Sequence, residues 1–341
     1  MQTGSFDLLT PKAVISSVEQ THLYQLDGMV TPYPSYVNRV FGLTSDTGEP
    51  LVVKFYRPGR WTYDAILDEH DFLEDCAADE IPVVVPIKDS EGDTLAEVTV
   101  ADNGIEETFF YALFPRMGGR NFDAESDDDW YRLGTIVGRC HTTGKKQIAA
   151  NRETCHPIKN TGAYLQELLD ENLVSPICRD DFETVCRDLI GEIVPLFEDL
   201  DIQRLHGDCH RGNILDRADE GLVLYDFDDM VNGPAVQDLW LLLPDYAGNC
   251  RRELLMLLDG YEQFVELDRS TLKLIEPLRF MRMVYFLVWR ARQRHDFWFN
   301  SNFPDWGTEA FWIKEVEDLR VQKNVIRDFL DEFAENQWSI T

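Results

Sequence analysis

The sequence predicts an α+β fold in which a small, mainly β N-terminal lobe precedes a larger, mainly α C-terminal lobe. Before residue 115, short apolar or alternating segments separated by turn residues predict strands. After Pro115, apolar residues recur at intervals of three and four, the period of a helix that buries one face. The two patterns meet at about 113–119, where proline and two glycines occur. We therefore expect lobes over 1–115 and 116–341, with the active site in a cleft between them.

The N-terminal lobe is expected to contain one sheet and two helices. Thr10 and Pro11 are an N-cap and a first-turn proline, and they predict a helix that ends near Glu19. A second helix is predicted by residues that recur at helical spacing, namely Ile66, Glu69, Leu73 and Cys76. The expected strands are Tyr36–Leu43, Leu51–Tyr56, Val83–Ile87, Leu95–Val100 and Thr108–Phe114.

The C-terminal lobe is expected to be helical apart from one strand pair. Ser126 and Asp127 cap a helix whose apolar stripe is Trp130, Leu133, Val137 and Cys140. The strand pair is predicted over Asn213–Leu215 and Leu222–Tyr225, around a turn at 216–221. Further helical patterns cover about 161–171, 180–199, 236–243, 250–267, 271–293 and 310–334.

Composition excludes several classes of partner. The 341 residues carry 62 Asp and Glu against 32 Lys and Arg, which gives a formal net charge of −30. Such a surface repels phosphate backbones, so neither nucleic-acid binding nor docking on anionic membranes is expected. We find neither a signal peptide nor an apolar run of membrane-spanning length. Seven cysteines without a Cys-x-x-Cys pair are typical of reduced thiols, so we expect a cytoplasmic protein, and we expect a monomer.

The segment richest in chemistry runs from His206 to Asn213. Asp208 precedes Asn213 by five residues, and Asp226 follows thirteen residues later across the predicted strand pair. Phosphoryl transfer to a hydroxyl needs a carboxylate that accepts the hydroxyl proton and oxygen ligands that hold Mg²⁺ on the phosphates. An Asp, an Asn five residues on and a second Asp after a short hairpin supply that set. The structural alternative is turn capping for Asp208 and Asp226, and turn formation after Gly212 for Asn213.

Lys54 and Glu69 form a second candidate pair. Lys54 lies in an apolar strand, where a buried ammonium is costly unless a carboxylate pairs with it. Glu69 lies on the inward stripe of the helix in the same lobe. In active kinases such a pair orients the lysine towards the nucleotide phosphates. A surface lysine at a strand edge is the alternative.

With these residues in place, the sequence resembles the aminoglycoside-phosphotransferase-like branch of the kinase fold. Within that branch it is similar to the bacterial stress response kinase A family, described as Ser/Thr protein kinases. The resemblance covers about residues 25–315 and predicts a bilobal, protein-kinase-like fold. Besides His206–Asn213 and Tyr225–Asp228, it rests on Ser35–Val40, Val52–Pro58, Phe114–Pro115, Gly118–Arg120, Asn232–Trp240 and Ile275–Arg279.

The resemblance implies an ATP- and Mg²⁺-dependent Ser/Thr protein kinase. It makes Asp208 the catalytic base, and it makes Asn213 and Asp226 the magnesium ligands, so that Asp226 also belongs to the catalytic group. Lys54, held by Glu69, would bind the phosphates, and Ser35 would contact ATP in the nucleotide-covering turn. The expected partners are ATP and either a protein Ser/Thr substrate or a small alcohol.

Some features depart from the family pattern or stay open. The nucleotide-covering turn, 34–40, contains no glycine, so Ser35 and backbone N–H groups would have to hold the phosphates. Asp228 is a candidate second metal ligand, and Asp238 either braces the catalytic loop or simply begins a helix. Cys209 is either a redox-sensitive thiol or an apolar filler. The late aromatic residues line a substrate surface or pack as core, namely Phe297, Trp298, Phe299, Phe303, Trp306, Phe311 and Trp312.

Three other functions compete with a protein kinase. A small-alcohol kinase keeps the same chemistry, and it is favoured by the short segment from Asp226 to Asp238, which are twelve positions apart, too few for a long activation loop. A metal-dependent hydrolase would use the His206-x-Asp208-x-His210 pattern, but the other histidines are scattered. A nucleotide-binding regulator without catalysis would have no need of the complete residue set.

Overall fold

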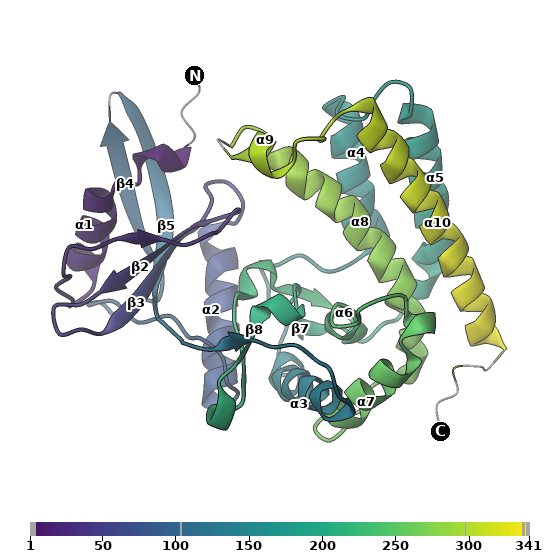
Figure 1. Ribbon diagram of the computed structural model, residues 1–341, viewed down its shortest axis with the longest axis horizontal. Helices are drawn as coiled ribbons and strands as arrows, with labels where there is room; N and C mark the ends of the chain where they lie inside the picture. Colours follow the sequence, from purple (N-terminus) through teal and green to yellow (C-terminus); the bar gives the residue numbers. More distant parts are fainter. Residues whose placement is uncertain (1–4, 103, 297, 336–337, 339–341) are drawn as a thin grey trace. The chain divides into compact units, whose positions relative to one another are not determined.

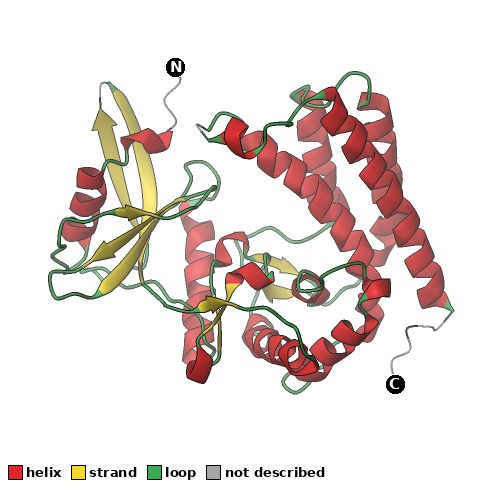
Figure 2. Cartoon of the chain, viewed as in Figure 1, coloured by secondary structure: helices red, strands yellow, loops and turns green. Residues whose placement is uncertain are grey.

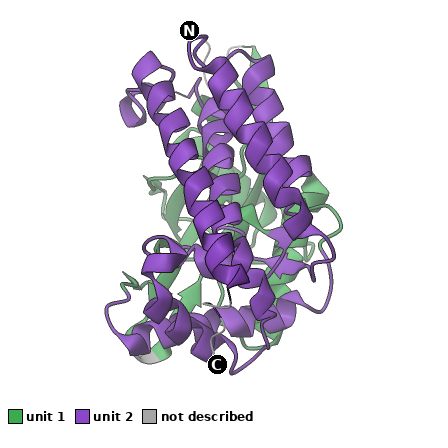
Figure 3. Cartoon of the chain, turned by 90° about the vertical axis from the view of Figure 1, so that its right-hand side faces the viewer, with its two compact units in different colours: residues 1–123, 149–152, 211–230 green, residues 124–148, 153–210, 231–341 purple. Residues whose placement is uncertain are grey.

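The computed structural model describes residues 5–102, 104–296, 298–335 and 338, and the chain divides into two compact units (Figure 3). Unit 1 comprises residues 1–123, 149–152 and 211–230, and unit 2 comprises residues 124–148, 153–210 and 231–341. The units are interleaved along the chain, because two later segments return to unit 1. These units do not test the predicted lobe boundary at 115/116, which stays a prediction. The mixture of one main sheet with many helices is the α+β content that the sequence predicts (Figure 2).

Unit 1 is built on a five-stranded antiparallel sheet with the order β1-β2-β3-β5-β4. Alternate residues of β3 point to opposite faces, so Leu51, Val53 and Phe55 enter one apolar core and Lys54 faces the other side. The strands are β1 Thr31–Pro32, β2 Arg39–Thr44, β3 Pro50–Phe55, β4 Ala96–Asp102 and β5 Ile105–Pro115.

One helix covers each face of this sheet (Figure 1). α1 (Pro11–Thr21) buries Val14 and Val18 against the core face of β3, and Thr10 caps it as predicted. α2 (Tyr63–Ala78) buries Ile66 in a second core with Ala112, the register partner of Lys54. The Lys54 face of β3 is therefore the face that α2 covers.

A second, smaller sheet in unit 1 has the order β6-β8-β9. β8 and β9 pair antiparallel in register Ile214 with Leu224, so the predicted strand pair is confirmed. The strands are β6 Arg120–Asn121, β8 Ile214–Asp216 and β9 Leu222–Leu224.

Unit 2 is mainly helical. Helices α8 and α10 pack with α4 and α5, and α3 packs along α7 (Figure 1). Its two short strands pair antiparallel as β7 Gln203–Leu205 and β10 Val231–Gly233. The helices are α3 Asp127–Gly144, α4 Ala163–Asp170, α5 Arg179–Ile193, α6 Val236–Trp240, α7 Arg251–Tyr261, α8 Ile275–Arg292, α9 Phe299–Asn302 and α10 Glu309–Ala334.

The predicted strand Val83–Ile87 is wrong. In the structure, Val83 and Ile87 each form a single isolated bridge, to Leu224 and Leu113 respectively. Pro82 precedes this segment and Pro86 lies within it, and a proline has no N–H to donate to a ladder. The apolar run is real, but its backbone cannot pair continuously.

Helix boundaries differ from the predictions where proline or a tight turn intervenes. The predicted helix over 180–199 ends at Ile193, and Pro195 lies in a 3₁₀ turn after it. The predicted helix over 271–293 begins at Ile275, after a 3₁₀ turn that ends at Leu274. Ser126 caps α3 as predicted, and it also forms a capping box with Asp129, which the predicted Ser126–Asp127 cap did not include. The short strands β7 and β10 were not predicted, because three residues carry too little periodicity.

In the part of the chain that the structure describes, no helix combines the length and the apolar character that a membrane crossing needs.

The α3–α7 contact depends on glycines. A Cβ added at Gly134 of α3 would lie 1.8 Å from the carbonyl oxygen of Leu257 in α7. A Cβ added at Gly260 of α7 would lie 2.0 Å from the carbonyl oxygen of Tyr131 in α3. Only glycine allows the two backbones to approach this closely. The approach matters for the site because α3 also carries His141.

We expect two glycine-to-alanine substitutions in unit 2 to have opposite effects on stability. Gly134→Ala forces α3 and α7 apart and should lower the free energy of unfolding by about 1–3 kcal/mol. Gly191→Ala, at an exposed α5 position with nothing within 4 Å, should leave stability unchanged or raise it by up to about 1 kcal/mol. Urea unfolding of the three proteins measures both effects, and a neutral Gly134→Ala would contradict the packing described above.

Candidate active site

Lys54 is the centre of a buried ion-pair network in unit 1. Its Nζ lies 3.6 Å from Glu69 Oε1 and 3.3 Å from both Asp226 Oδ1 and Asp228 Oδ1. Lys54 is only 8% exposed, and burial alone would lower its pKa. The charges of Asp228, Glu69 and Asp226 outweigh burial and hold the pKa well above its usual value. The lysine therefore stays charged, and its predicted pairing with Glu69 is confirmed.

Glu69 reaches this network from the inner face of α2. It is 1% exposed, and its second oxygen, Oε2, accepts a hydrogen bond from Arg152 Nη2 at 3.0 Å. Burial raises the pKa of Glu69, and the neighbouring Lys54 opposes this rise. One carboxylate thus bridges two cations, which is the arrangement that makes a buried charge tolerable.

The β8–β9 hairpin brings Asn213 and Asp226 to the same end of the small sheet. The Tyr225 N–H donates to the carbonyl oxygen of Asn213 at 3.1 Å, and Asp226 follows directly. Asp226 adopts a left-handed conformation with φ of 60°, which is costly for a residue with a side chain. Its side chain is 51% exposed, although one oxygen contacts Lys54. This conformation differs from a simple turn cap, because the Asp226 side chain makes no cap hydrogen bond to the 3₁₀ turn that follows.

Asp228 and Asp229 are both paired with Arg60. Arg60 Nη1 contacts Asp228 Oδ2, and Arg60 Nη2 donates to Asp229 Oδ1 at 2.6 Å. Burial would raise the pKa of Asp228, but Arg60, Lys54 and Arg152 together hold it well below its usual range. Asp228 is therefore ionised and engaged by cations, and a second metal role for it stays a prediction.

The oxygens of Asp226 and Asn213 could hold a hard cation such as Mg²⁺ only together with further oxygens from a bound substrate. Among the described residues, no group of three or more His, Cys, Asp or Glu is arranged to hold a metal ion. Asp226 and Asn213 offer a carboxylate and an amide oxygen, which are ligands that Mg²⁺ prefers. Protein sites for Mg²⁺ commonly use one or two carboxylates together with substrate phosphates. The residues present fit that kind of site.

Ser35 lies outside the ion-pair network, in the loop between β1 and β2. Arg57 and Asn38 hold this loop. Arg57 Nε donates to the carbonyl oxygen of Val37 at 2.8 Å, and the Asn38 side chain accepts from the Arg57 N–H at 3.1 Å. The loop thus has a defined conformation without glycine. Whether Ser35 contacts a nucleotide stays a prediction.

Asp208 belongs to unit 2, on a loop that Asp238 braces. The Asp238 carboxylate accepts hydrogen bonds from the backbone N–H groups of His206 at 2.8 Å and Gly207 at 2.9 Å. It also contacts His141 of α3, 3.0 Å from Nε2. This confirms the bracing role and shows why α3 must lie close to α7, since Tyr261 of α7 contacts the other nitrogen of His141.

The Asp208 carboxylate lies between two basic side chains. His210 Nε2 lies 3.5 Å from Oδ2, and Arg282 of α8 donates to Oδ1. Burial would raise the pKa of Asp208, but the hydrogen bond of His210 and the charge of Arg282 hold it far below its usual range. Asp208 is therefore ionised at neutral pH and oriented by α8.

Two open alternatives are decided by burial. Cys209 is 1% exposed, and burial followed by the charges of Asp238 and Asp208 raises its pKa well above the usual value. A protonated, buried thiol is an apolar filler, not a redox site. In the late aromatic cluster, Phe299 and Trp312 are buried, and their rings contact Trp306, which favours core packing. Trp298 is exposed, and Phe297 lies outside the described residues.

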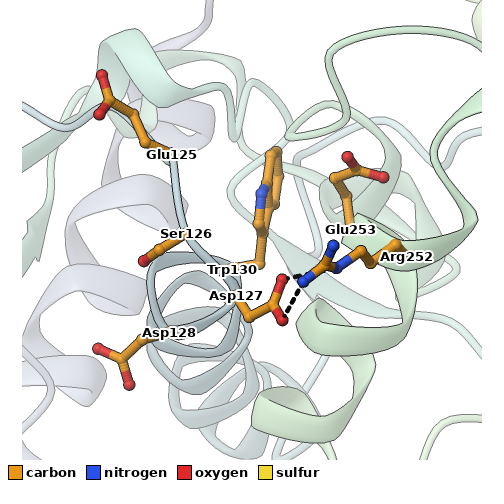
Figure 4. Close-up of a pocket in the computed structure, with 7 residues that line it drawn as sticks. All are labelled: Glu125, Ser126, Asp127, Asp128, Trp130, Arg252 and Glu253. Carbon is orange, nitrogen blue, oxygen red and sulfur yellow. Dashed lines mark hydrogen bonds and ion pairs between the residues drawn. The ribbon is translucent and has the colours of Figure 1, made fainter.

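A separate pocket of about 470 Å³ lies on unit 2, between the start of α3 and the start of α7 (Figure 4). Asp127 faces Arg252 across it, with two hydrogen bonds of 2.9 and 2.7 Å. Its lining is mostly acidic, namely Glu125, Ser126, Asp127, Asp128, Trp130, Arg252 and Glu253. None of the predicted site residues lines it.

Three arginines complete the site and were missed by sequence reasoning. Unit 1 brings together Lys54, Glu69 and Asp226, and Arg60 and Arg152 join them. In unit 2, Arg282 joins Asp208. Each arginine lies more than 70 residues from an acid that it contacts, so local spacing carried no signal. For Arg282, its closeness to the family segment Ile275–Arg279 was the available sign.

Comparisons with known proteins agree with this geometry. Residues 30–275 match the family described as the phosphotransferase enzyme family. The stress response kinase A of Escherichia coli K12 is 37% identical over 329 residues, which cover 95% of each chain. A Salmonella typhimurium protein named serine/threonine protein kinase RdoA is 35% identical over the same coverage. The resemblance that the sequence predicts is confirmed.

Solved structures show the same fold at low sequence identity. An amicoumacin kinase in complex with AMP-PNP, Ca²⁺ and a ligand named Ami has a TM-score of 0.72 at 18% identity, covering 94% of this chain and 95% of its own. A microcompartment-associated aminopropanol kinase has a TM-score of 0.69 at 15% identity, covering 95% of this chain and 98% of its own. The predicted kinase-like fold is confirmed.

We expect His70, next to Glu69, to make stability depend on pH. Burial, then the charges of Lys54 and Arg152, lower its pKa to about 3, and its ring contacts Tyr56 and Thr94 at 2.9 Å. Between about pH 6.5 and 3, the unfolded chain binds a proton that the folded chain does not, so this group should remove about 1.4 kcal/mol of stability per unit of falling pH. Urea unfolding from pH 7 to pH 4.5 measures it. His70→Gln should show a shallower slope than the wild type or the exposed control His295→Gln, and equal slopes would contradict the assignment.

Proposed function

Because this chain belongs to the phosphotransferase enzyme family, we propose that it transfers the γ-phosphate of ATP to a hydroxyl in a Mg²⁺-dependent reaction, with Ser or Thr of a protein as the acceptor. The observation that carries the proposal is the contact of one buried lysine with both a helix glutamate and Asp226. That combination serves phosphate binding, because it places a permanent positive charge next to a carboxylate that suits a metal.

Lys54 would bind the phosphates. Its Nζ is held by carboxylates on α2 and on the segment after β9, so little conformational freedom is left to lose on binding. Glu69 would keep the amine directed, as in other kinases. Ser35 and the backbone N–H groups of the loop between β1 and β2 would contact the phosphates.

Asn213 and Asp226 would hold the metal. When bound, Mg²⁺ would neutralise charge on the phosphate oxygens and orient them. The left-handed backbone of Asp226 supports this role, since strained residues of this kind concentrate at functional sites. Asp226 keeps about half of its side chain exposed, which leaves it open to a ligand.

Asp208 would act as the base. The acceptor oxygen forms a bond to the γ-phosphorus, the bond from that phosphorus to the bridging oxygen of ADP breaks, and the hydroxyl proton goes to Asp208. His210 and Arg282 keep this carboxylate ionised and oriented for the proton. Catalysis of phosphoryl transfer rests mainly on positioning and electrostatic stabilisation, so a carboxylate with a strongly lowered pKa can still fill this role.

A protein acceptor is supported by the relatives. A Salmonella typhimurium relative that matches 95% of this chain is named a serine/threonine protein kinase, and others are named stress response kinases. That likeness supports a Ser or Thr hydroxyl of a protein as the proposed acceptor.

A small alcohol is the second candidate acceptor. The stretch from Asp226 to Asp238 is taken up by a 3₁₀ turn, β10 and the start of α6, so it holds no long activation loop. The proteins of similar fold reported above are named an amicoumacin kinase and an aminopropanol kinase. This candidate shares every proposed residue role and differs only in the acceptor.

We expect two aspartate substitutions to separate binding from turnover. Asp208→Asn should lower kcat by about 100- to 10,000-fold, while the Kd for ATP with Mg²⁺ stays within about twofold. Asp226→Ala should abolish the dependence of nucleotide binding on Mg²⁺. Titration calorimetry with a non-hydrolysable ATP analogue and an ADP-release assay measure both. The exposed Asp259→Asn is the control, and full turnover by Asp208→Asn would contradict the base assignment.

We expect labelled ATP to mark protein and not small molecules. Purified wild-type protein with γ-labelled ATP and Mg²⁺ should label itself or proteins of a lysate, and Asp208→Asn should label none. The label should survive treatment with acid, as phosphoserine and phosphothreonine do. If no protein is labelled while an amino alcohol, a sugar or an aminoglycoside stimulates ADP release, the small-alcohol candidate replaces the protein kinase.

A further inference from the structure

We infer that Arg152 is a positioning residue that couples helix α2 to the segment after Asp226, so that phosphate binding by Lys54 and metal binding by Asp226 depend on each other. The inference rests on the proposed function and adds a residue to which no role had been assigned. Its first support is the path of the chain. Residues 149–152 leave the surrounding helical unit and belong to unit 1, and the chain then returns to unit 2 at Glu153.

The contacts of Arg152 join two separate segments of unit 1. Nε donates to the carbonyl oxygen of Ala65 at 2.7 Å, and Nη2 donates to Glu69 Oε2 at 3.0 Å, both on α2. Nη1 donates to the carbonyl oxygens of Asp228 at 2.8 Å and Met230 at 3.3 Å. The guanidinium also lies 4.2 Å from the centre of the Trp61 ring.

On the α2 side, Arg152 determines which way the Glu69 carboxylate faces. Glu69 has two oxygens, and the guanidinium takes Oε2 while Oε1 faces Lys54 Nζ. The Ala65 contact fixes Arg152 one helical turn away on the same face of α2. Without the guanidinium, the carboxylate would be free to turn away from Lys54 or to draw Lys54 towards α2.

On the other side, Arg152 holds the backbone that begins immediately after the strained residue. Phe227–Asp229 is a 3₁₀ turn that starts from the left-handed Asp226, and the two carbonyls that Arg152 binds lie in and directly after this turn. Binding both carbonyls restrains the turn and so helps to maintain the conformation of Asp226. A planar guanidinium suits this task, because its several N–H groups point in fixed, diverging directions, whereas an ammonium is a single point charge.

Arg152 is 5% exposed and therefore cannot contact a nucleotide in this conformation. It would act through Glu69 and through the Asp226 turn. Since one guanidinium contacts both Glu69 and the turn after Asp226, a change at Arg152 should alter the affinity for the nucleotide and the affinity for Mg²⁺ together. A residue that only fills the core would alter stability alone.

The test compares nucleotide and magnesium binding in Arg152→Met, in the wild type and in a control, Arg187→Met, which removes an exposed arginine paired with Glu183. Calorimetric titration with a non-hydrolysable ATP analogue at a series of Mg²⁺ concentrations gives the Kd and the Mg²⁺ midpoint, and thermal unfolding gives Tm. We expect Arg152→Met to raise both constants roughly 10- to 100-fold, as for other residues that orient metal ligands. Arg187→Met should change neither.

A second variant keeps the test decisive if Arg152→Met does not fold. Arg152→Lys retains a charge for Glu69 but lacks a fork that also reaches the carbonyls of Asp228 and Met230. We expect it to keep the affinity for the ATP analogue at saturating Mg²⁺ within about threefold while the Mg²⁺ midpoint rises about tenfold. A lowered Tm with both constants unchanged in either folded variant would overturn the inference and leave the proposed function intact. Absence of Mg²⁺-dependent binding in the wild type would overturn the proposed function, and the inference with it.

Discussion

The interaction on which the structure of unit 1 depends is the buried ammonium of Lys54. An unpaired charge there would be too costly to keep, so the surrounding chain must supply carboxylates. Glu69, Asp226 and Asp228 do so, and they in turn require the cations Arg60 and Arg152. This one network joins four parts of unit 1, namely strand β3, helix α2, the turn after β9 and the segment 149–152. The position of α2 over the sheet follows from this network as well as from its apolar core with Ala112.

The ion-pair network around Lys54 has a net negative charge, which would favour the binding of a further cation. Lys54, Arg60 and Arg152 face Glu69, Asp226, Asp228 and Asp229, so the carboxylates exceed the cations by one. The most exposed of these carboxylates is Asp226, and it is therefore the one best able to accept a further cation from solution. This also explains how a chain of net charge −30 could bind an anionic nucleotide, since its local charges would attract a divalent metal together with the phosphates.

In unit 2, the tertiary contacts orient one carboxylate, that of Asp208, which lies on a loop. Asp238 holds the backbone of His206 and Gly207, while His141 and Tyr261 hold Asp238 through the α3–α7 contact. Glycines at that contact therefore matter to Asp208 although they lie far from it along the chain. Arg282 completes the arrangement from α8. The side chain proposed for proton transfer is thus oriented by residues of four helices, α3, α6, α7 and α8, and not by its own loop alone.

Local pattern was sufficient for the α+β class, most helices and the β8–β9 hairpin, because these depend on residues close together in the chain. Residue spacing also predicted Asp208, Asn213 and Asp226 as site residues. The Lys54–Glu69 pair could also be predicted, since each lies on the inner face of a recognisable element. The partners Arg60, Arg152 and Arg282 could not, because an ion pair between distant segments leaves no periodic signal in either one. The failed strand at Val83–Ile87 has a local cause in its two prolines, whereas β7 and β10 exist only because tertiary packing pairs them. Residue spacing thus predicted a candidate chemistry, and only the tertiary fold decided which arginines contact the acidic residues proposed for it.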